Sequence, residues 1–584
     1  MLLSCAKEGP AEQREFTLEA LMPQAETRTT LGEKAAGLYP VLWSEGDCIS
    51  VNGVLSRPLS ASDAGKTRAV FRFAESLQAP YSITYGGAVP AVQAYSEGGV
   101  GNFCAPLFAE SSQRSFIMRH RSCILRLPLS GSVRVAGISV SGGTPVQLTI
   151  PGGGIDVSGG KVFHIALDPG HFENGIIVHV YTASGEKMNL SAFTGERLQA
   201  GKVYELPQTQ FEANAGTFTA IGSYAELKAF AERVAAGENY LEARLTADIA
   251  GDATWSPLEG FSGDFDGGGY RISGLQKALA NELVGGIRNL TLDSAISISS
   301  KDDIVGDADI YWAGMVANRI YTRGLVSSCV TGGSITYHQW GKVVRVGAVA
   351  GYAPRGTVEN CVSATEITVI GDGSADIQAG GIMGRAYAAN DIVQIRGCRS
   401  EGSITLGGQV LSAHVGGIVG HFDPVHTSVL SGNRFSGSLT VDSSAAVSGE
   451  LYIGGIAGYS IDDFEDCSFS GTIHFKAPAT AAQNIGGIAG SVKTGSVAGC
   501  SNSGTIIGNG PSADVIRAGG ILGWAQNDGS AVTGISVSGC SFSGSIDIDI
   551  PSHSTIYAKP VTGLYSTTSH SETDCTVTGT VTVH

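Results

Sequence analysis

Apolar and polar residues alternate in short stretches between residues 28 and 213. Examples are residues 69–73, 81–85 and 123–127, and glycine or proline residues separate such stretches. Alternation with a period of two is typical of strands that bury one face, and turn residues at regular intervals favour antiparallel connections. The pattern therefore predicts two antiparallel β-sandwich domains, over residues 28–112 and 113–213.

The hydrophobic period changes from 2 to 3.6 just after the second of these domains. Ser223 and Glu226 have the spacing of a capping box, and Gly237 is a helix stop signal. The apolar residues between them fall on one helical face: Leu227, Phe230, Ala231 and Val234. We predict a short helix that covers the open edge of the repeats that follow it. Residues 214–309 are accordingly assigned to a capping helix and the first coils of a repeat domain.

A phrase of the form Gly-Gly-Ile-apolar-Gly recurs through the rest of the chain. Its clearest copies begin at positions 347, 380, 416, 454, 486 and 519, with spacings of 33, 36, 38, 32 and 33 residues. Weaker copies begin near positions 313 and 562, which makes about eight units. A unit of this size cannot bury its own apolar face, so the copies must stack on one another. We predict a parallel β-helix over residues 310–584. The alternative is a β-propeller, whose blades need four strands and about 40 to 50 residues each.

A second phrase, Cys-x-x-x-Gly, recurs with the same period as the first. Stacked coils place equivalent side chains about 4.8 Å apart, so the repeated cysteines should form one internal column. Side chains that point the same way fit poorly with disulfide geometry, and we expect buried thiols that act as small apolar groups. The predicted column consists of Cys329, Cys361, Cys398, Cys467, Cys500, Cys540 and Cys575. The pairing of three cysteines nearer the N-terminus stays open: Cys48, Cys104 and Cys123.

Two family resemblances rest on these motifs. The Gly-Gly-Ile phrase with Tyr352 after Gly351, and Asn360 before Cys361, resembles the GLUG repeat of bacterial surface proteins and IgA-peptidase-associated regions, over about residues 310–584. The two sandwich regions look like the fimbrillin-like family of Bacteroidetes surface proteins. The segments that carry this second resemblance are Thr-Arg-Thr at 27–29, Trp-Ser-Glu-Gly-Asp at 43–47, Leu-Arg-Leu-Pro-Leu-Ser-Gly at 125–131 and Ala-Gly-Lys-Val-Tyr at 200–204. Together the resemblances imply a pilus subunit, a pilus anchor or a related lipid-tethered adhesin.

The first residues, Met-Leu-Leu-Ser-Cys, resemble the end of a lipoprotein signal. This resemblance implies that Cys5 is acylated and that residues 1–27 are a lipoprotein-like N-terminus and tether. We expect membrane contact through this lipid anchor alone, on the extracellular face of the outer membrane. The alternative is a secreted protein.

Composition and charge narrow the possible partners. Glycine contributes 82 of 584 residues, about twice the usual share, and without a Gly-x-y period this favours glycine-turned β structure. The formal net charge of −16 argues against a nucleic-acid partner, which needs a basic stripe. We therefore expect a glycan or protein ligand at the cell surface, and fimbrial subunits as further partners.

Candidate chemistry is sparse in this chain. Parallel β-helices include polysaccharide lyases and glycoside hydrolases, which need clustered carboxylates or a basic residue. The carboxylates Asp264 and Asp266 lie in a glycine-rich turn, where Asx turns explain them. We predict no catalytic residue and no cofactor. The segment 421–426 holds three weak metal-ligand candidates, but we interpret it as an exposed loop and predict no metal: His421, Asp423 and His426.

The predicted function is binding by an adhesin that presents the β-helix surface. Aromatic residues of the repeat region are the candidates for a sugar platform: Trp312, Tyr337, Trp340, Tyr352, Tyr387, Tyr459 and Trp524. Two alternatives remain open. One is a carbohydrate-active enzyme on the β-helix, either a polysaccharide lyase or a glycoside hydrolase, and the other is a structural pilus component.

Overall fold

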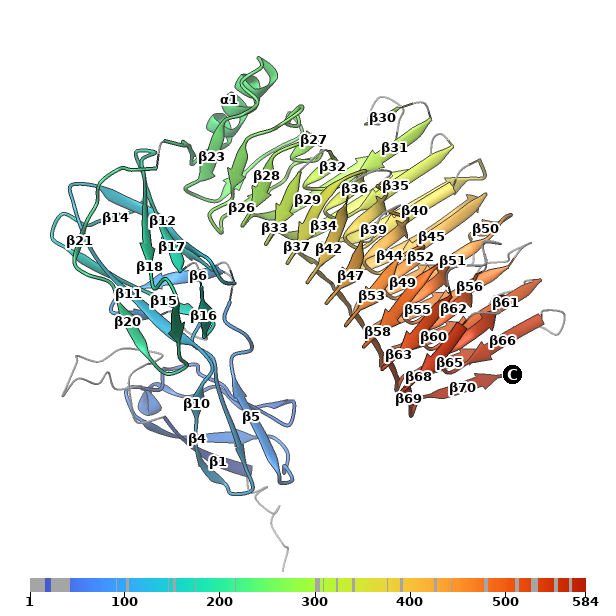
Figure 1. Cartoon of the computed structure of the whole chain (residues 1–584), viewed down its shortest axis with the longest axis horizontal. Coiled ribbons are helices and arrows are strands. Elements are labelled where there is room, and N and C mark those ends of the chain that lie inside the picture. Colours follow the sequence, from blue (N-terminus) through green and yellow to red (C-terminus); the bar gives the residue numbers. More distant parts are fainter. Residues whose placement is uncertain are drawn as a thin grey trace, which may run out of the picture. The chain divides into compact units, whose positions relative to one another are not determined.

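The structure is a computed structural model that divides into two compact units, residues 1–218 and 219–584 (Figure 1). It describes residues 16–22, 42–90, 92–100, 104–144, 146–150, 154–173, 175–215, 217–299, 305–307, 309–321, 324–338, 342–374, 376–388, 392–424, 428–442, 444–476, 482–509, 514–526, 534–550, 555–566 and 570–584. Each unit is described by itself.

The first unit contains two hydrophobic cores. In the first core, β1 (Phe16–Leu21) pairs antiparallel with β4 (Arg68–Phe73), and both strands bury alternate residues. A second sheet, centred on β5 (Tyr81–Tyr85) and β8 (Leu107–Ser111), supplies the rest of this core. The buried Trp43 packs its ring against one aromatic ring from each sheet. This alternation is what the sequence predicted for a sandwich.

The second core lies between two further sheets. One is centred on β11 (Cys123–Ser130) and β15 (Lys161–Leu167), which pair antiparallel. The other is centred on β12 (Arg134–Ser141) and β17 (Ile176–Thr182), which also pair antiparallel. Buried residues of all four strands form a single cluster.

Two predicted boundaries in this unit differ from the structure. β1 lies inside the segment predicted as a tether, because its alternate residues, such as Phe16 and Leu18, complete the first core. The boundary at 112 is also crossed twice. β6 (Val92–Ser96) pairs in parallel with β13 (Val146–Thr149) of the second core, whereas β9 (Ser115–Ile117) pairs with β1 of the first. Each core therefore contains a strand from the other side of residue 112, so no single boundary in the sequence divides the two cores.

The helix is confirmed as α1 (Tyr224–Ala235). Ser223 caps it, because its Oγ accepts a hydrogen bond from the Glu226 backbone nitrogen at 3.3 Å. The four predicted apolar residues are all buried. The ring of Phe230 lies 5.8 Å from that of Phe261, so the helix covers the first coils as expected. The described residues contain no helix that is both long and apolar enough to cross a membrane.

The second unit is a parallel β-solenoid, so the predicted β-helix is confirmed. One turn consists of β36 (Ala350–Ala353), β37 (Gly356–Glu359), β38 (Val362–Ser363), β39 (Glu366–Asp372) and β40 (Asp376–Gly380). Each of these strands pairs in parallel with its equivalent in the next turn. Strands of successive turns join into sheets of 12, 19, 9 and 9 strands, whereas a propeller would keep them in separate blades (Figure 1).

The repeated cysteines lie at one position of the turn and are free thiols. The carbonyl of Cys329, for example, accepts a hydrogen bond from the residue after the cysteine of the next turn, at 2.8 Å. All are buried except Cys575, in the last coil, which is partly exposed. Asn433 takes this position in one turn. Its Oδ1 accepts a hydrogen bond from the Cys398 nitrogen at 2.9 Å, and its Nδ2 donates to the Ile395 carbonyl at 2.8 Å. The three cysteines of the first unit are free as well: Cys48, Cys104 and Cys123.

Candidate binding surface

Two neighbouring sheets of the solenoid carry two rows of polar and aromatic side chains along its length. The first row occupies equivalent positions of β31 (Ile310–Ala313), β35 (Val343–Gly347), β40, β45 (Ser412–Gly416), β51 (Leu451–Gly454), β56 (Gln483–Gly486) and β61 (Val515–Gly519). It consists of Trp312, Arg345, Gln378, His414, Tyr452, Asn484 and Arg517.

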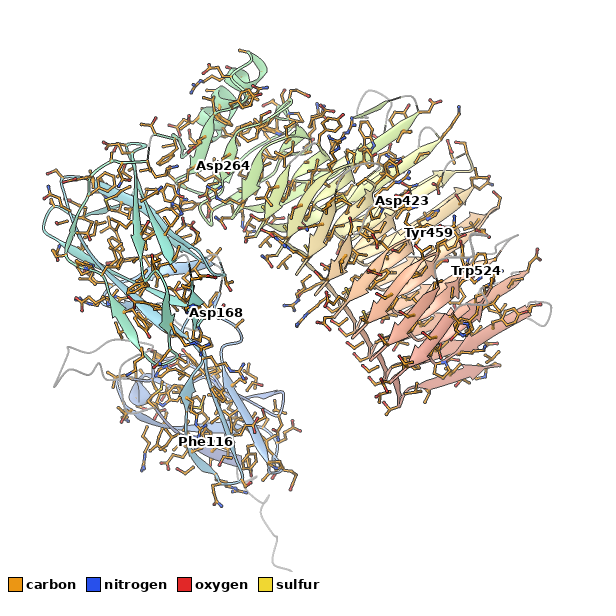
Figure 2. The ribbon with its side chains drawn as sticks, viewed as in Figure 1. Phe116, Asp168, Asp264, Asp423, Tyr459 and Trp524 are labelled. Carbon is orange, nitrogen blue, oxygen red and sulfur yellow. The ribbon has the colours of Figure 1, made fainter. Side chains whose placement is uncertain are left out.

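The second row occupies equivalent positions of β32 (Ala317–Ile320), β36, β41 (Met383–Ala386), β46 (Val419–Phe422), β52 (Ala457–Ser460), β57 (Ala489–Val492) and β62 (Leu522–Ala525). It consists of Arg319, Tyr352, Arg385, His421, Tyr459, Ser491 and Trp524. Figure 2 shows Asp423, Tyr459 and Trp524 following one another along the same flank of the solenoid. The two rows together are called the double row below.

The glycines of the repeat bring the two rows together. A Cβ at Gly384 in β41 would lie 2.5 Å from the Gly351 carbonyl oxygen and 2.6 Å from the Val346 nitrogen in β35. Only glycine lets the backbones of the two sheets approach this closely. The second-row residue follows this glycine in the chain, and in two turns its ring lies against the first-row arginine of the same turn.

Ring and guanidinium contacts join the rows in several turns. The rings of Trp312 and Tyr352 stack at 6.0 Å with an interplanar angle of 14°. Arg517 lies over Trp524 at 3.9 Å from the ring centroid. Most members of the first row, such as Gln378, are almost fully buried, whereas Arg517 and the second-row aromatic residues keep part of their surface exposed. A ligand on this surface would therefore lie on the second-row rings, with the polar groups of the first row beneath it.

The centre of the double row is rich in titratable groups. The rings of His414 and His421 stack at 4.5 Å, and each Nε2 lies 3.5 Å from a carboxylate oxygen, of Asp376 and Asp423 respectively. Burial lowers the pKa of both histidines, so both rings are neutral at pH 7. Their Nδ1 atoms have no hydrogen-bond partner among the described residues. Arg385 donates two hydrogen bonds to Asp423, at 3.0 and 2.5 Å.

Four of the predicted platform residues belong to the double row: Trp312, Tyr352, Tyr459 and Trp524. Tyr387 lies beside it, with its ring 5.1 Å from the Arg385 guanidinium. Tyr337 is fully buried in the solenoid core, so no ligand can reach its ring. Trp340, His426 and the predicted lipidation site Cys5 lie outside the described residues.

Sequence reasoning missed most of the first row, although a simple signal marks it. A first-row residue stands two positions before the first glycine of the repeat phrase, as Arg345 does before Gly347. A second-row residue stands directly after the last glycine, as Tyr352 does after Gly351. The missed residues include Arg345, Gln378, His414, Tyr452, Asn484 and Arg517.

The interpretation of segment 421–426 as an exposed loop is wrong at its start. β46 continues through Phe422, and His421 is a largely buried member of the second row. Asp423 already accepts both hydrogen bonds from Arg385, which leaves it poorly placed as a metal ligand. No group of three His, Cys, Asp or Glu residues suited to a metal ion occurs in the part of the chain that the structure describes.

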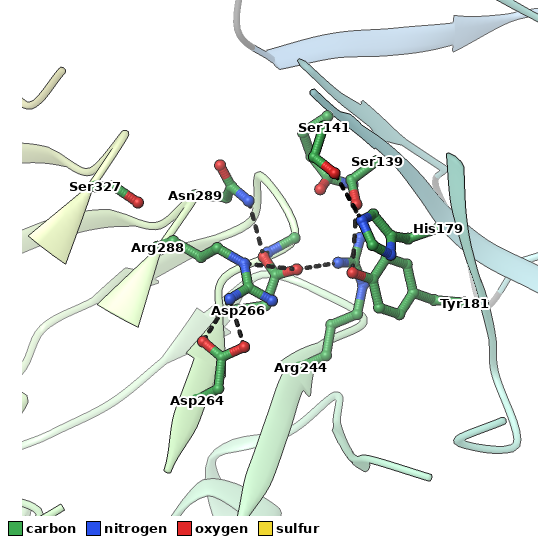
Figure 3. A network of polar contacts seen from close by, with 12 residues as sticks. Ser139, Ser141, His179, Tyr181, Arg244, Asp264, Asp266, Arg288, Asn289 and Ser327 are labelled. Carbon is green, nitrogen blue, oxygen red and sulfur yellow. Dashed lines mark hydrogen bonds and ion pairs between the residues drawn. The ribbon is translucent and has the colours of Figure 1, made fainter. Parts of the chain in front are cut away.

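The carboxylate pair in the first coils is part of an ion-pair network (Figure 3). Arg288 binds Asp264, and the fully buried Arg244 binds Asp266. Burial by itself would raise the pKa of Asp266, but Arg244 and Arg288 outweigh it and hold that pKa below its ordinary value. Asn289 donates a further hydrogen bond to Asp266 at 3.2 Å. Both carboxylates are paired with arginines in this network, which leaves them poorly placed as catalytic acids or bases.

No protein-family model matches the chain, and no curated protein is similar to it. Solved structures are similar to parts of it. A "putative immunoglobulin A1 protease" from Bacteroides ovatus matches at 18% identity over 45% of this chain and 78% of that chain, with a TM-score of 0.34. A "putative cell adhesion protein" from the same species matches at 12% identity over 33% and 91%, with a TM-score of 0.22. The tip fimbrial protein of Porphyromonas gingivalis matches at 8% identity over 33% and 96%, with a TM-score of 0.17.

Proposed function

We propose that this protein is a cell-surface adhesin and that the double row is its glycan-binding surface. The observation that carries the proposal is the row of partly exposed rings of Tyr352, Tyr459 and Trp524, which stand beside buried polar groups. Aromatic faces offer sugar rings a flat apolar contact, and convergent polar groups orient their hydroxyls. Equivalent positions repeat about every 4.8 Å along the stack. This favours an extended glycan over a compact ligand.

The placement at the cell surface rests on the family resemblances of the sequence. The fimbrillin-like resemblance of the first unit supports fimbrial subunits as partners, and the resemblance of the first residues to a lipoprotein signal supports an anchor at Cys5. Blotting of purified native fimbriae for this protein tests the first point. Mass spectrometry of the N-terminal peptide from membrane fractions tests the second.

A panel of polysaccharides, titrated against the full chain, tests the binding surface. We expect one class to bind, with Trp524→Ala lowering the affinity about 10-fold because an aromatic contact of about 1 kcal/mol and its buried area are lost. Tyr240→Ala is the matched control, since Tyr240 is 79% exposed and lies outside the double row. Equal losses in both variants, or no binding by any member of the panel, would contradict the proposal.

The second candidate function is an enzyme that cleaves the bound glycan. The observation in its favour is the pair of His414 and His421 in the double row, with Asp376 beside His414, because histidine and carboxylate side chains serve as general acids and bases. We favour binding because Asp423, the other carboxylate at this place, is held by Arg385. Prolonged incubation with the same panel distinguishes the two. New reducing ends or unsaturated products that disappear in His414→Gln would establish the enzyme.

A further inference from the structure

The double row contains four arginines, and they fall into two kinds. Arg319 forms an ion pair with Glu282 at 3.2 Å, and Arg385 forms one with Asp423 at 2.5 Å. Both belong to the second row. The other two, Arg345 and Arg517, belong to the first row, and neither forms an ion pair with a described residue.

Arg345 is almost completely buried, with 5% of its surface exposed. Its Nε donates a hydrogen bond to the Gln378 side chain at 3.0 Å, and its guanidinium lies over the Tyr352 ring at 4.2 Å from the centroid. Burial lowers the pKa of Arg345 to about 10, with Arg385 adding to the decrease and Tyr352, Asp423 and Asp376 opposing it, so this group remains charged at neutral pH. A buried charge without a counter-charge in contact is costly unless something else compensates for it.

Arg517 repeats this arrangement near the other end of the double row. Its guanidinium lies over the Trp524 ring, its Nη1 donates to the Asn484 side chain at 2.8 Å, and its Nε has no partner among the described residues. In both turns the arginine comes from the first row, a neutral amide of that row holds it, and the second-row aromatic of the same turn lies against it. The two arginines are separated by five turns, which corresponds to roughly 24 Å along the stack.

We infer that the double row binds an acidic glycan, with Arg345 and Arg517 each receiving one of its anionic groups while Tyr352 and Trp524 contact the attached sugar rings. A guanidinium binds carboxylate and sulfate groups through paired N–H donors, and a site that excludes water strengthens this interaction. The anionic group supplies a counter-charge in direct contact. The nearby carboxylates, Asp376 and Asp423 for Arg345 and Glu450 for Arg517, raise the arginine pKa values but form no ion pair with them. Carboxylate and sulfate share this chemistry, and both are carried by extended polysaccharides. The inference rests on the proposed function and specifies the class of its ligand.

The test measures the affinity of the full chain for polygalacturonate, for the same polymer with its carboxylates methyl-esterified, for dextran sulfate and for dextran. We expect at least 10-fold tighter binding of one anionic polymer than of its neutral counterpart. Arg345→Gln and Arg517→Gln should each remove most of that preference. Arg399→Gln, which deletes the same charge from a different sheet, should leave it unchanged.

The outcomes distinguish the inferred preference for an acidic glycan from the proposed glycan-binding surface itself. Preference for polygalacturonate identifies carboxylate as the recognised group and preference for dextran sulfate identifies sulfate, and either supports the inference. Equal binding of charged and neutral polymers overturns it and leaves the glycan platform in place. Binding of none of the four, together with a wider panel that binds nothing, overturns the platform itself. We expect Arg345→Gln to keep the wild-type melting temperature, because the substitution removes a buried charge that no carboxylate contacts. If it does not, the partly exposed Arg517→Gln decides the outcome.

Discussion

The interior of the solenoid and its double row repeat with the same period, but residue types are uniform from turn to turn in the interior and differ from turn to turn in the double row. In the interior, one position holds isoleucine in five turns, namely Ile382, Ile418, Ile456, Ile488 and Ile521, and all are fully buried. In the first row of the double row, no two neighbouring turns carry the same residue. An interior side chain must fit the equivalent side chain above and below it, so uniformity stabilises the stack. Side chains of the double row do not have to fit identical neighbours in this way. Their residue types can therefore differ from turn to turn, as a surface that recognises a specific ligand requires.

The largest effect is expected where the two regions meet, at the glycine corner. Gly384→Ala places a methyl group within about 2.6 Å of backbone atoms of neighbouring strands. Because backbone cannot move aside as a flexible side chain can, we expect a loss of about 4 kcal/mol or more in the free energy of unfolding. Urea unfolding of the full chain measures it. Gly332→Ala is the matched control, since its Cβ would meet atoms at ordinary contact distance, 3.7 Å or more.

An interior substitution should lower stability and leave binding intact. Ile418→Ala removes three carbons from a fully buried position, which costs about 3 kcal/mol. The affinity for the polysaccharide that the wild type binds should stay within about twofold, because Ile418 points away from the double row. An affinity loss as large as that of Trp524→Ala would show that the interior and the double row do not act separately.

Restoring the repeat where it is broken should have a smaller, destabilising effect. Asn433→Cys recreates the cysteine column but exchanges two amide hydrogen bonds, with the Cys398 nitrogen and the Ile395 carbonyl, for weaker sulfur contacts. We expect a loss of about 1 kcal/mol in unfolding free energy. An increase in the denaturation midpoint would mean that uniformity of the column outweighs hydrogen bonding at this position.

Acidification should lower the stability of the folded chain through the histidine pair of the double row. The folded-state pKa values of His414 and His421 lie below the ordinary value of 6.5 because both rings are buried. The unfolded chain therefore binds more protons as the pH falls below 6.5, and the stability that these groups contribute above that pH is lost. Of the charged groups facing them, Arg345 and Arg385 oppose protonation and Asp376 favours it.

Urea midpoints at pH 7 and pH 5 measure this effect. We expect a lower midpoint at pH 5 for the wild type, and a smaller decrease for the variant carrying both His414→Gln and His421→Gln. Burial raises the pKa of Asp423 above its ordinary value, so this group takes up a proton more readily in the folded chain and works in the opposite direction as the pH falls. Identical decreases in the two proteins would exclude the histidine pair as the cause.

The features that could be predicted from the sequence are those set by local repetition. The spacing of the glycine phrase predicted the stacked coils, and Ser223 with Glu226 predicted the helix start, because each depends on residues a few positions apart. The strand β1 was missed because six residues carry too short an alternation to separate from a tether. The role of His421 was missed because its neighbours within the second row, Arg385 and Tyr459, belong to other turns, and because the period of the first row, which holds His414, was not recognised.

By itself, the sequence determined the column of coils, the helix in front of it and the uniform interior, since a period of 32 to 38 residues with glycine corners admits few other packings. Only the tertiary structure decided which polar side chains face one another and which arginines of the double row form no ion pair. The physical reason is that these contacts depend on the packing of strands. Arg345 and Tyr352 meet because two sheets pack backbone to backbone at a glycine corner, and Trp312 joins them from the turn before.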